Sequence, residues 1–388
     1  MTEDEFLFLA SERGRATVAE HVGSDPARVA LTRGLPMAAT TATQVKYLAR
    51  AAQKLPSYSS AGCVLPPRAY EQSSSEAAAR ARGYEGELCI DLTCGLGVDA
   101  LWLARRFARV VAVERDPLLC EVARHNFALL GAENIEVTCG AAEDFLAGFQ
   151  GRADLVFVDP DRRNASGRRL YGLEDCAPNV VELAPLLQRA ARVAAIKCSP
   201  LFDVDMARRL FGDHTLCRVV SLGGECKELL VEIGDHIPRP RIEAEAIGCG
   251  RFGCDAMRER PSAAAFDLSD AHYLTIPDVA LQKSRTAIDY FRPLGAHIES
   301  DNGYALSVMP LDAPLGRSVE ILSIALFSPR ALARTLRQRG VRRLDILVRD
   351  FPISAAEIAR RLNVTPGGAT AIAFTSLAGK PVAIEVRD

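Results

Sequence analysis

The stretch LCIDLTCGLGVDA, residues 88–100, decides the fold of this chain. A short apolar run leads directly into a loop that contains Gly95 and Gly97, and apolar residues resume after the loop. Glycines in such a loop let the backbone pass close to a ligand, and a helix that follows it presents free N–H groups. The stretch therefore predicts a buried strand, a ligand-binding loop and a helix in succession.

Further apolar runs continue this pattern along the chain. Five runs are separated by segments long enough for crossover helices, as in buried parallel strands: LCIDL (88–92), RVVAVE (109–114), NIEVTC (134–139), DLVFVD (154–159) and RVAAIKC (192–198). Two more, LCRVVSL (216–222) and ELLVEI (228–233), lie too close together for a crossover and should form an antiparallel hairpin. The predicted fold class is α/β, with the seven-stranded Rossmann-like sheet of class I methyltransferases and a ligand at the carboxyl ends of its strands.

The chain as a whole divides into four predicted regions. They are an N-terminal helical region (1–82), the sheet domain (83–236), a Pro-rich linker with a small α+β unit (237–316) and a compact α/β lobe (317–388). In the first region, a serine cap at residues 73–75 should open a helix rich in Ala and Arg. In the third, we expect a helix at 279–291 and a hairpin turn at Asp301-Asn302-Gly303.

Composition is that of a globular protein, since 48% of the 388 residues are apolar and 25% are charged. No stretch approaches 18 uncharged apolar residues, and the N-terminus is acidic, so we expect neither a membrane span nor a signal peptide. Several of the 11 cysteines, among them Cys89, Cys139 and Cys198, fall in predicted buried strands. Buried thiols favour a reducing cytoplasm, and the spacing of Cys226, Cys249 and Cys254 does not predict a metal site.

The glycine loop fits two cofactors, and Asp91 discriminates between them. Gly95, Gly97 and Ala100 also match a loose dinucleotide fingerprint. A carboxylate at the end of the first strand, however, would oppose a pyrophosphate and would favour the ammonium group of S-adenosylmethionine. We therefore expect S-adenosylmethionine at a loop that includes Thr93, Cys94 and Asp99.

The acids after the second and third strands are candidates for the rest of the cofactor. Glu114 ends the second strand, where an acid can accept hydrogen bonds from both ribose hydroxyls, and Arg115 follows it. A solvated glutamate at a strand end is the alternative for Glu114. After the third strand, Glu143 or Asp144 would receive the adenine amino group, although either one would also suit a helix cap.

The loop after the fourth strand reads Asp159-Pro160-Asp161-Arg162-Arg163. It resembles the D/N-P-P-aromatic loop of amino-group methyltransferases, in which a carboxylate and the proline carbonyl accept N–H bonds from an exocyclic amine. This resemblance assigns catalysis to Asp159 and Pro160, mainly through positioning. Asp161 and Arg162 depart from the motif, which leaves the methylated atom open. Arg162 and Arg163 would hold a phosphate or stack on a base, or would form a surface pair with acidic neighbours.

Taken together, several motifs resemble the bacterial family of methyltransferases that carry a THUMP-like C-terminal domain. The motifs are the Asp91 and Asp159 loops, residues 72–76, Lys197-Cys198-Ser199-Pro200 and Glu225-Cys226-Lys227-Glu228, with Arg349-Asp350-Phe351-Pro352 and Gly367-Gly368 near the end. The resemblance covers nearly the whole chain. It implies a ferredoxin-like insert around 272–315 and a THUMP-like lobe around 317–388.

The same resemblance extends to the substrate and to further site residues. The segment around Ser75 and Glu76 is similar to one in trimethylguanosine synthases, which implies that Gln72, Ser75 and Glu76 close over the methionine end of the cofactor; a simple helix start is the alternative. Lys197, Ser199 and Lys227 would border the substrate. THUMP domains in general bind RNA, and from Arg317 onward the chain holds 12 Lys and Arg against 6 Asp and Glu.

The predicted function is methyl transfer from S-adenosylmethionine to a nitrogen of a base in ribosomal or transfer RNA. A protein or small-molecule substrate is one alternative, and a cofactor fold that binds without turnover is another. The sequence leaves open which RNA and which atom is modified, the oligomeric state, and whether the N-terminal helices contact the substrate.

Overall fold

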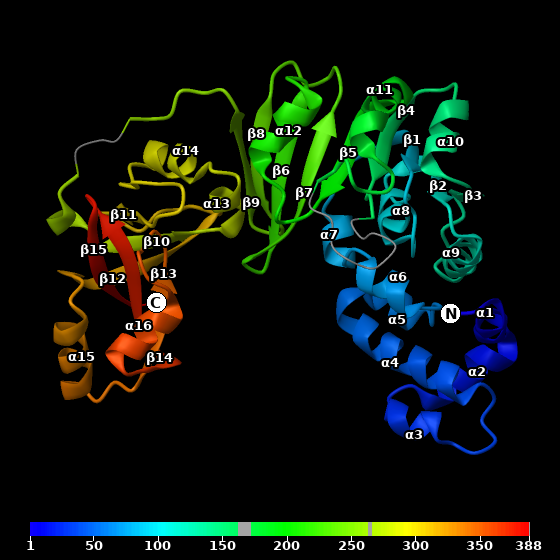
Figure 1. The fold of residues 1–388 in the computed structure, drawn as a ribbon, viewed down its shortest axis with the longest axis horizontal. Coiled ribbons are helices and arrows are strands. Elements are labelled where there is room, and N and C mark those ends of the chain that lie inside the picture. The colour runs from blue at the N-terminus through cyan, green and yellow to red at the C-terminus, as the bar shows by residue number, and fades with distance from the viewer. Residues whose placement is uncertain (162–171, 263–265, 388) are drawn as a thin grey trace. The chain divides into compact units, whose positions relative to one another are not determined.

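The computed structural model describes residues 1–161, 172–262 and 266–387 and divides the chain into two compact units (Figure 1). The first unit comprises Met1–Phe202, Met206–Thr215 and Leu230–Pro238. The second comprises Asp203–Asp205, Leu216–Leu229 and Arg239–Asp388. Among the described residues, no helix is long and apolar enough to cross a membrane.

The predicted parallel strands are all present. They are β1 (Gly86–Asp91), β2 (Phe107–Glu114), β3 (Ile135–Cys139), β4 (Ala153–Val158) and β5 (Ala191–Cys198). They pair in parallel in the order β3-β2-β1-β4-β5, so the direction of winding reverses between β1 and β4. At such a switch point the loops after neighbouring strands separate and leave room for a ligand at their carboxyl ends.

The crossover helices lie between these strands in the chain, as the spacing of the apolar runs predicts. They are α8 (Val98–Leu103), α9 (Pro117–Leu129), α10 (Ala142–Gly148) and α11 (Val180–Ala190), followed by α12 (Val204–Phe211). Some of these helices have a side-chain N-cap and one begins after a glycine. Asp116 caps α9 and Asn179 caps α11 through side-chain oxygens, whereas α8 begins after Gly97, whose φ is 84°.

The predicted hairpin is formed by β6 (Thr215–Leu222) and β7 (Glu225–Ile233), which Gly223 and Gly224 connect. Both glycines have positive φ, as a tight turn between antiparallel strands requires. The α/β class is confirmed, but the sheet also contains β8 (Arg241–Ala246) and β9 (Gly250–Asp255), giving the order β3-β2-β1-β4-β5-β7-β6-β8-β9. The prolines at 238 and 240 had suggested a linker, yet the alternating run RIEAEA that follows them buries Ile242, Ala244 and Ala246.

The N-terminal region is helical, and its helices gather on one side of the first unit (Figure 1). They are α1 (Glu3–Ala10), α2 (Glu12–His21), α3 (Pro26–Ala30), α4 (Ala38–Lys54), α5 (Pro56–Ser60), α6 (Pro67–Gln72) and α7 (Glu76–Arg80). Ser75 is the N-cap of α7 and accepts a hydrogen bond from the Ala78 amide, which confirms the predicted helix start.

A buried segment at residues 63–65, between α5 and α6, is hydrogen-bonded to α4 of the helical region and to α9 of the sheet domain. The Gln44 side chain accepts from the Leu65 amide and donates to the Cys63 carbonyl. The fully buried Asn126 of α9 accepts from the Val64 amide at 2.8 Å and donates to the Val64 carbonyl at 3.0 Å. Two amide side chains thus replace the partner strands that buried backbone would otherwise need.

The second unit contains a six-stranded sheet in the order β11-β10-β12-β15-β14-β13. Its strands are β10 (Tyr273–Pro277), β11 (Ala305–Ser307), β12 (Gly316–Leu326), β13 (Arg343–Val348), β14 (Thr365–Leu377) and β15 (Lys380–Arg387). The helices α15 (Pro329–Gln338) and α16 (Ala355–Leu362) lie between β12 and β13 and between β13 and β14 in the chain. Strands from both predicted C-terminal regions therefore share one sheet.

Two local predictions were wrong. The helix expected at 279–291 is broken into α13 (Val279–Lys283) and α14 (Ala287–Phe291) because Arg285 has a φ of 56°, which no α-helix accommodates. Cys139, expected to be buried, is exposed because it lies at the end of β3, the strand at the sheet edge. All eleven cysteines are free thiols.

Replacing Asn126 with alanine should lower the free energy of unfolding by about 2–4 kcal/mol, because a buried amide and a buried carbonyl of Val64 lose their partners. Urea denaturation followed by circular dichroism measures the change. Asn179→Ala is the control, since it removes only an N-cap and should cost about 1 kcal/mol. Equal losses for both variants would contradict the role given to Asn126.

Candidate active site

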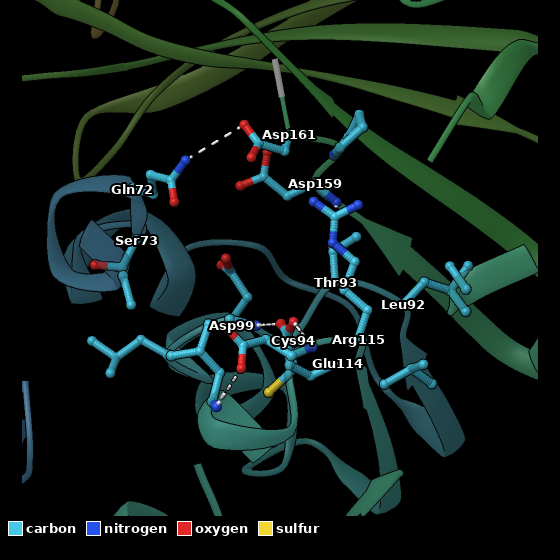
Figure 2. A pocket seen from close by; sticks show the side chains of 18 of the residues that line it. Gln72, Ser73, Leu92, Thr93, Cys94, Asp99, Glu114, Arg115, Asp159 and Asp161 are labelled. Atoms are coloured by element: carbon cyan, nitrogen blue, oxygen red, sulfur yellow. Dashed lines mark hydrogen bonds between the residues drawn. The ribbon is translucent and has the colours of Figure 1, made fainter. Parts of the chain in front are cut away.

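A cavity of about 540 Å³ opens in the first unit at the carboxyl ends of β1, β2 and β4. Figure 2 shows that side chains from α6, from the loops after these strands and from the glycine loop surround it. The predicted site residues that line it are Gln72, Thr93, Cys94, Gly95, Asp99, Glu114, Arg115, Glu143, Asp159, Pro160 and Asp161. The structure therefore gathers most of the predicted site around one space.

The glycine loop follows a path that its backbone hydrogen bonds fix. The Leu92 amide donates to the Phe157 carbonyl of β4, and the Cys94 amide donates to the Val113 carbonyl of β2, each at 2.9 Å. Gly97 has a φ of 84°, and a Cβ at this position would lie 2.4 Å from the Phe127 ring. Glycine fits here because it adopts this positive φ readily and has no Cβ to meet the ring.

Glu114 connects the glycine loop to the end of β2. One carboxylate oxygen accepts from the Gly95 amide at 2.8 Å, and the other accepts from the Asp116 amide at 2.9 Å. A carboxylate can accept about four hydrogen bonds, so these two leave capacity for two further donors. Glu114 is thus held in place at the cavity wall while it keeps the acceptors that two ribose hydroxyls would need.

A chain of polar side chains forms part of the cavity wall and continues into the protein behind it. The Arg82 guanidinium contacts Asp99 at 2.7 Å, and the Ser74 hydroxyl donates to the other Asp99 oxygen at 2.7 Å. The same hydroxyl accepts from Lys197 at 2.9 Å and from Arg82 at 3.1 Å. Lys197 in turn contacts Asp159 at 2.6 Å. Sequence reasoning placed Ser74 only in a helix cap and gave Arg82 no role, because only the tertiary fold brings these two residues to their partners.

The charges in this chain set the protonation of Asp99. Burial alone would raise the pKa of Asp99, but the positive charges of Arg82 and Lys197 and the Ser74 hydrogen bond outweigh burial and leave the pKa below its ordinary value. Asp99 is therefore an anion at neutral pH. Because it lines the cavity, it presents negative charge to a ligand.

Asp91 lies deeper than expected. It is 1% exposed and is not among the described residues that line the cavity. Its carboxylate accepts from the Thr93 amide at 3.0 Å and so shapes the start of the glycine loop. Burial, together with the negative charges of Asp99 and Asp159, raises the pKa of Asp91 to about 8. The cofactor contact predicted for Asp91 stays a prediction.

The loop after β4 is fixed to the glycine loop and to α6. The Asp159 amide donates to the Thr93 hydroxyl at 2.7 Å. Asp161 exchanges backbone hydrogen bonds with Ala177, and its carboxylate lies 3.4 Å from both Arg68 and Gln72 of α6. Figure 2 shows the Gln72 contact. Arg162 and Arg163, predicted to contact substrate, lie outside the described residues.

The remaining predicted residues have other partners. The buried Glu76 accepts from both the amide and the hydroxyl of Ser57 at 2.8 Å, so its carboxylate caps α5, and neither it nor Ser75 is among the described residues that line the cavity. The Ser199 hydroxyl accepts from the Leu201 amide. Lys227, in the second unit, pairs with Glu225 at 2.6 Å.

The two acids after β3 differ in position. Glu143 lines the cavity, whereas Asp144 is not among the described residues that do so. The N-cap of α10 is Ala141, so neither acid occupies the capping position. Of the two acids left open by the sequence, the geometry favours Glu143 for a ligand contact.

The raised pKa of Asp91 should make the free energy of unfolding depend on pH, and replacing Asp91 with asparagine should remove this dependence. The folded protein keeps Asp91 protonated up to about pH 8, whereas the unfolded chain ionises it near its ordinary pKa of 3.8. The wild type should therefore lose stability relative to Asp91→Asn as pH rises, by about 1.4 kcal/mol per pH unit between about pH 5 and 7. Urea unfolding of both proteins across this range measures the difference, and parallel curves would contradict it.

Comparisons with known proteins agree with this geometry. A methyltransferase-domain model matches residues 89–162, and a THUMP-domain-like model matches residues 316–388. A relative from Mycobacterium tuberculosis, named an uncharacterized S-adenosylmethionine-dependent methyltransferase, is 28% identical over 303 residues, which are 77% of this chain and 80% of the relative. A tRNA/tmRNA (uracil-C(5))-methyltransferase of Pectobacterium atrosepticum is 32% identical over 152 residues, which are 35% of this chain and 37% of that enzyme.

Among solved structures, a putative methyltransferase from Porphyromonas gingivalis W83 superimposes with a TM-score of 0.83 and 27% identity. It covers 100% of this chain, and this chain covers 99% of it. The predicted fold and the predicted THUMP-like C-terminal lobe are both confirmed. The chain thus combines a methyltransferase domain with a THUMP-like domain, and it is an S-adenosylmethionine-dependent methyltransferase.

Proposed function

We propose that this chain transfers a methyl group to a nitrogen of an RNA base. One observation carries the proposal: Asp159 and Pro160 line the same cavity as Gly95 and Glu114, so a base held by the first pair would face a cofactor held by the second. RNA as the substrate class is supported by the printed names of several relatives and by the THUMP-like domain.

The cavity fits S-adenosylmethionine by its donor set. Glu114 keeps acceptors for the two ribose hydroxyls, Glu143 in the cavity lining would accept from the adenine amino group, and the Asp99 anion would attract the methionine ammonium. When bound, this cofactor supplies an electrophilic methyl group on a sulfonium. The protein's part is then to position the nucleophile, since direct transfer gains most from alignment and from charges placed in advance.

Asp159 is prepared to position an amine. One of its carboxylate oxygens is held by Lys197 at 2.6 Å, and the Asp159 amide is held by Thr93. The other carboxylate oxygen has no partner among the described residues and would accept one N–H of the base, while the Pro160 carbonyl would accept the second. Both protons then point away from the methyl group, so the nitrogen lone pair points toward it. The carboxylate also stabilises the positive charge that develops on the nitrogen.

Carbon is the competing target, because several relatives are named uracil-C(5) methyltransferases. Carbon 5 of uracil becomes nucleophilic only after another nucleophile, such as a thiolate, adds to carbon 6. Cys94 lines the cavity, but burial raises the pKa of its thiol well above the ordinary value. Cys198 is 1% exposed, with its sulfur 3.8 Å from the Ile196 carbonyl. Among the described residues that line the cavity, no cysteine favours the thiolate that an attack on carbon 6 requires. This supports nitrogen as the methylated atom.

The THUMP-like domain offers a basic helix for RNA contact. Arg330, Arg334 and Arg337 recur on α15 at intervals that place them on one face, and all three are exposed. Other arginines of this domain are partly neutralised, since Arg339 pairs with Glu385 and Arg360 with Glu357. We therefore assign the phosphate contacts of this domain to α15.

A matched pair of alanine variants tests the adenine contact. Glu143→Ala should weaken binding of S-adenosylhomocysteine roughly fivefold to tenfold, because a hydrogen bond to a carboxylate is lost. Asp144→Ala should leave affinity unchanged, since this neighbour is not among the described residues that line the cavity. Isothermal titration calorimetry measures the affinity of both variants. If Asp144→Ala weakens binding and Glu143→Ala does not, the adenine contact belongs to Asp144.

The function itself is tested with radiolabelled S-adenosylmethionine and total RNA from a strain that lacks the gene. The wild-type protein should label this RNA but not RNA from the parent strain, and Asp159→Ala should lower the rate at least a hundredfold while S-adenosylhomocysteine still binds. The exposed Glu133→Ala is the control and should leave the rate unchanged. Mass spectrometry of digested RNA should show a nucleoside methylated on nitrogen. Finding 5-methyluridine instead would overturn the assignment of the atom, and no label in RNA would overturn the substrate.

A further inference from the structure

Helices α4 and α6 contact each other in the first unit (Figure 1). Cationic residues and tyrosines alternate along the sequence at this contact. The group comprises Lys46, Tyr47, Arg50 and Lys54 of α4 with Tyr70 of α6, and we call it the aromatic–cation face. The two rings meet edge to face, with centroids 5.2 Å apart. No described part of the glycine loop or of the Asp159 loop belongs to this group.

Each cation of the face lies against a ring. The Arg50 guanidinium is 5.2 Å from the Tyr47 centroid and 5.5 Å from that of Tyr70. Lys46 lies 5.8 Å from Tyr47, and Lys54 lies 4.8 Å from Tyr70. Tyr70 is buried, but Tyr47 is half-buried, and Lys46 and Arg50 are exposed. A planar ring and a planar guanidinium are therefore presented together at the surface.

This face continues into the cavity through α6. Glu71 accepts from Arg50 at 2.5 Å, and it also lines the cavity. On the same helix, Arg68 and Gln72 contact the Asp161 carboxylate in the loop that we expect to hold the target base. An RNA strand that leaves the cavity across α6 would therefore contact Arg50 and Tyr47 next.

The charges of this region match a polyanion. Four cations, Lys46, Arg50, Lys54 and Arg68, stand against two carboxylates, Glu71 and Asp161. The ion pair between Arg50 and Glu71 is half exposed on both sides, and such pairs contribute little to stability. A phosphate can therefore replace Glu71 as the partner of Arg50 at small cost.

We propose that the aromatic–cation face binds the single-stranded RNA that flanks the target base, with a neighbouring base stacked on Tyr47 and Arg50. Single-stranded nucleic acid is recognised by aromatic and guanidinium planes that stack on bases and by cations that follow the backbone. This inference rests on the proposed function, because it takes RNA as the substrate. It gives the N-terminal helices a part in holding the substrate.

Fluorescence anisotropy with a fluorescein-labelled single-stranded RNA of about 12 nucleotides tests the inference at low salt. Tyr47→Ala and Arg50→Ala should each weaken binding roughly tenfold. Arg50→Lys, which keeps the charge, should also bind more weakly because the stacking plane is lost. Arg28→Ala, an exposed cation on α3, is the matched control and should change affinity less than about twofold. Titration with S-adenosylhomocysteine shows whether each variant keeps the folded cavity.

The possible failures are distinguishable. If wild type binds the RNA and the Tyr47 and Arg50 variants bind it equally well, the aromatic–cation face is not the docking surface, and the RNA substrate stands. If Arg50→Lys matches wild type while Arg50→Ala does not, stacking is overturned and only charge remains. If wild type binds no RNA and labels none, the inference fails together with the proposed function.

Discussion

The arrangement of this site depends on one serine hydroxyl. Ser74 donates to Asp99 and accepts from both Lys197 and Arg82, which uses all of its hydrogen-bonding capacity. Through it, the segment before α7, the start of α8 and the end of β5 share one buried network, and Lys197 extends that network to Asp159. The cofactor side and the proposed substrate side of the cavity are thereby held in one fixed geometry. Such alignment is what direct methyl transfer requires, since a small displacement of the nucleophile costs much of the rate.

Much of this architecture could be predicted from local sequence. The five parallel strands and the hairpin appear where apolar runs stand, because a strand covered on both faces must be apolar along its length. Gly97 was predictable as part of a ligand loop, although its specific constraint, the Phe127 ring, belongs to the tertiary fold. The strands β8 and β9 were missed because prolines just before them suggested a linker, while the alternation of RIEAEA was the signal that would have found β8.

The site was predictable in its parts and less so in its connections. The acids at strand ends could be found because the carboxyl ends of parallel strands meet at one edge of the sheet. The side chains that hold the acidic residues of the site could not, since Ser74 and Arg82 reach Asp99 from a distant segment. Glu76 shows the limit of motif resemblance. Its position suggested a cofactor contact, yet both of its oxygens accept from Ser57 at the start of α5. In this chain the carboxylate stabilises a helix that supports the cavity.

The charge balance of the site follows from where the acids are buried. Three carboxylates, Asp91, Asp99 and Asp159, share two neighbouring cations, Arg82 and Lys197. If all three acids were ionised, one negative charge would be left uncompensated in a buried site, which is costly. Asp91 relieves this, because its pKa near 8 keeps it mostly protonated at neutral pH and leaves the remaining charges paired. A cationic ligand beside Asp99 would change that balance, lower the pKa of Asp91 and release a proton as it binds. Buried Asp91 would then respond to the positive charge of the cofactor, in keeping with its place at the end of the first strand.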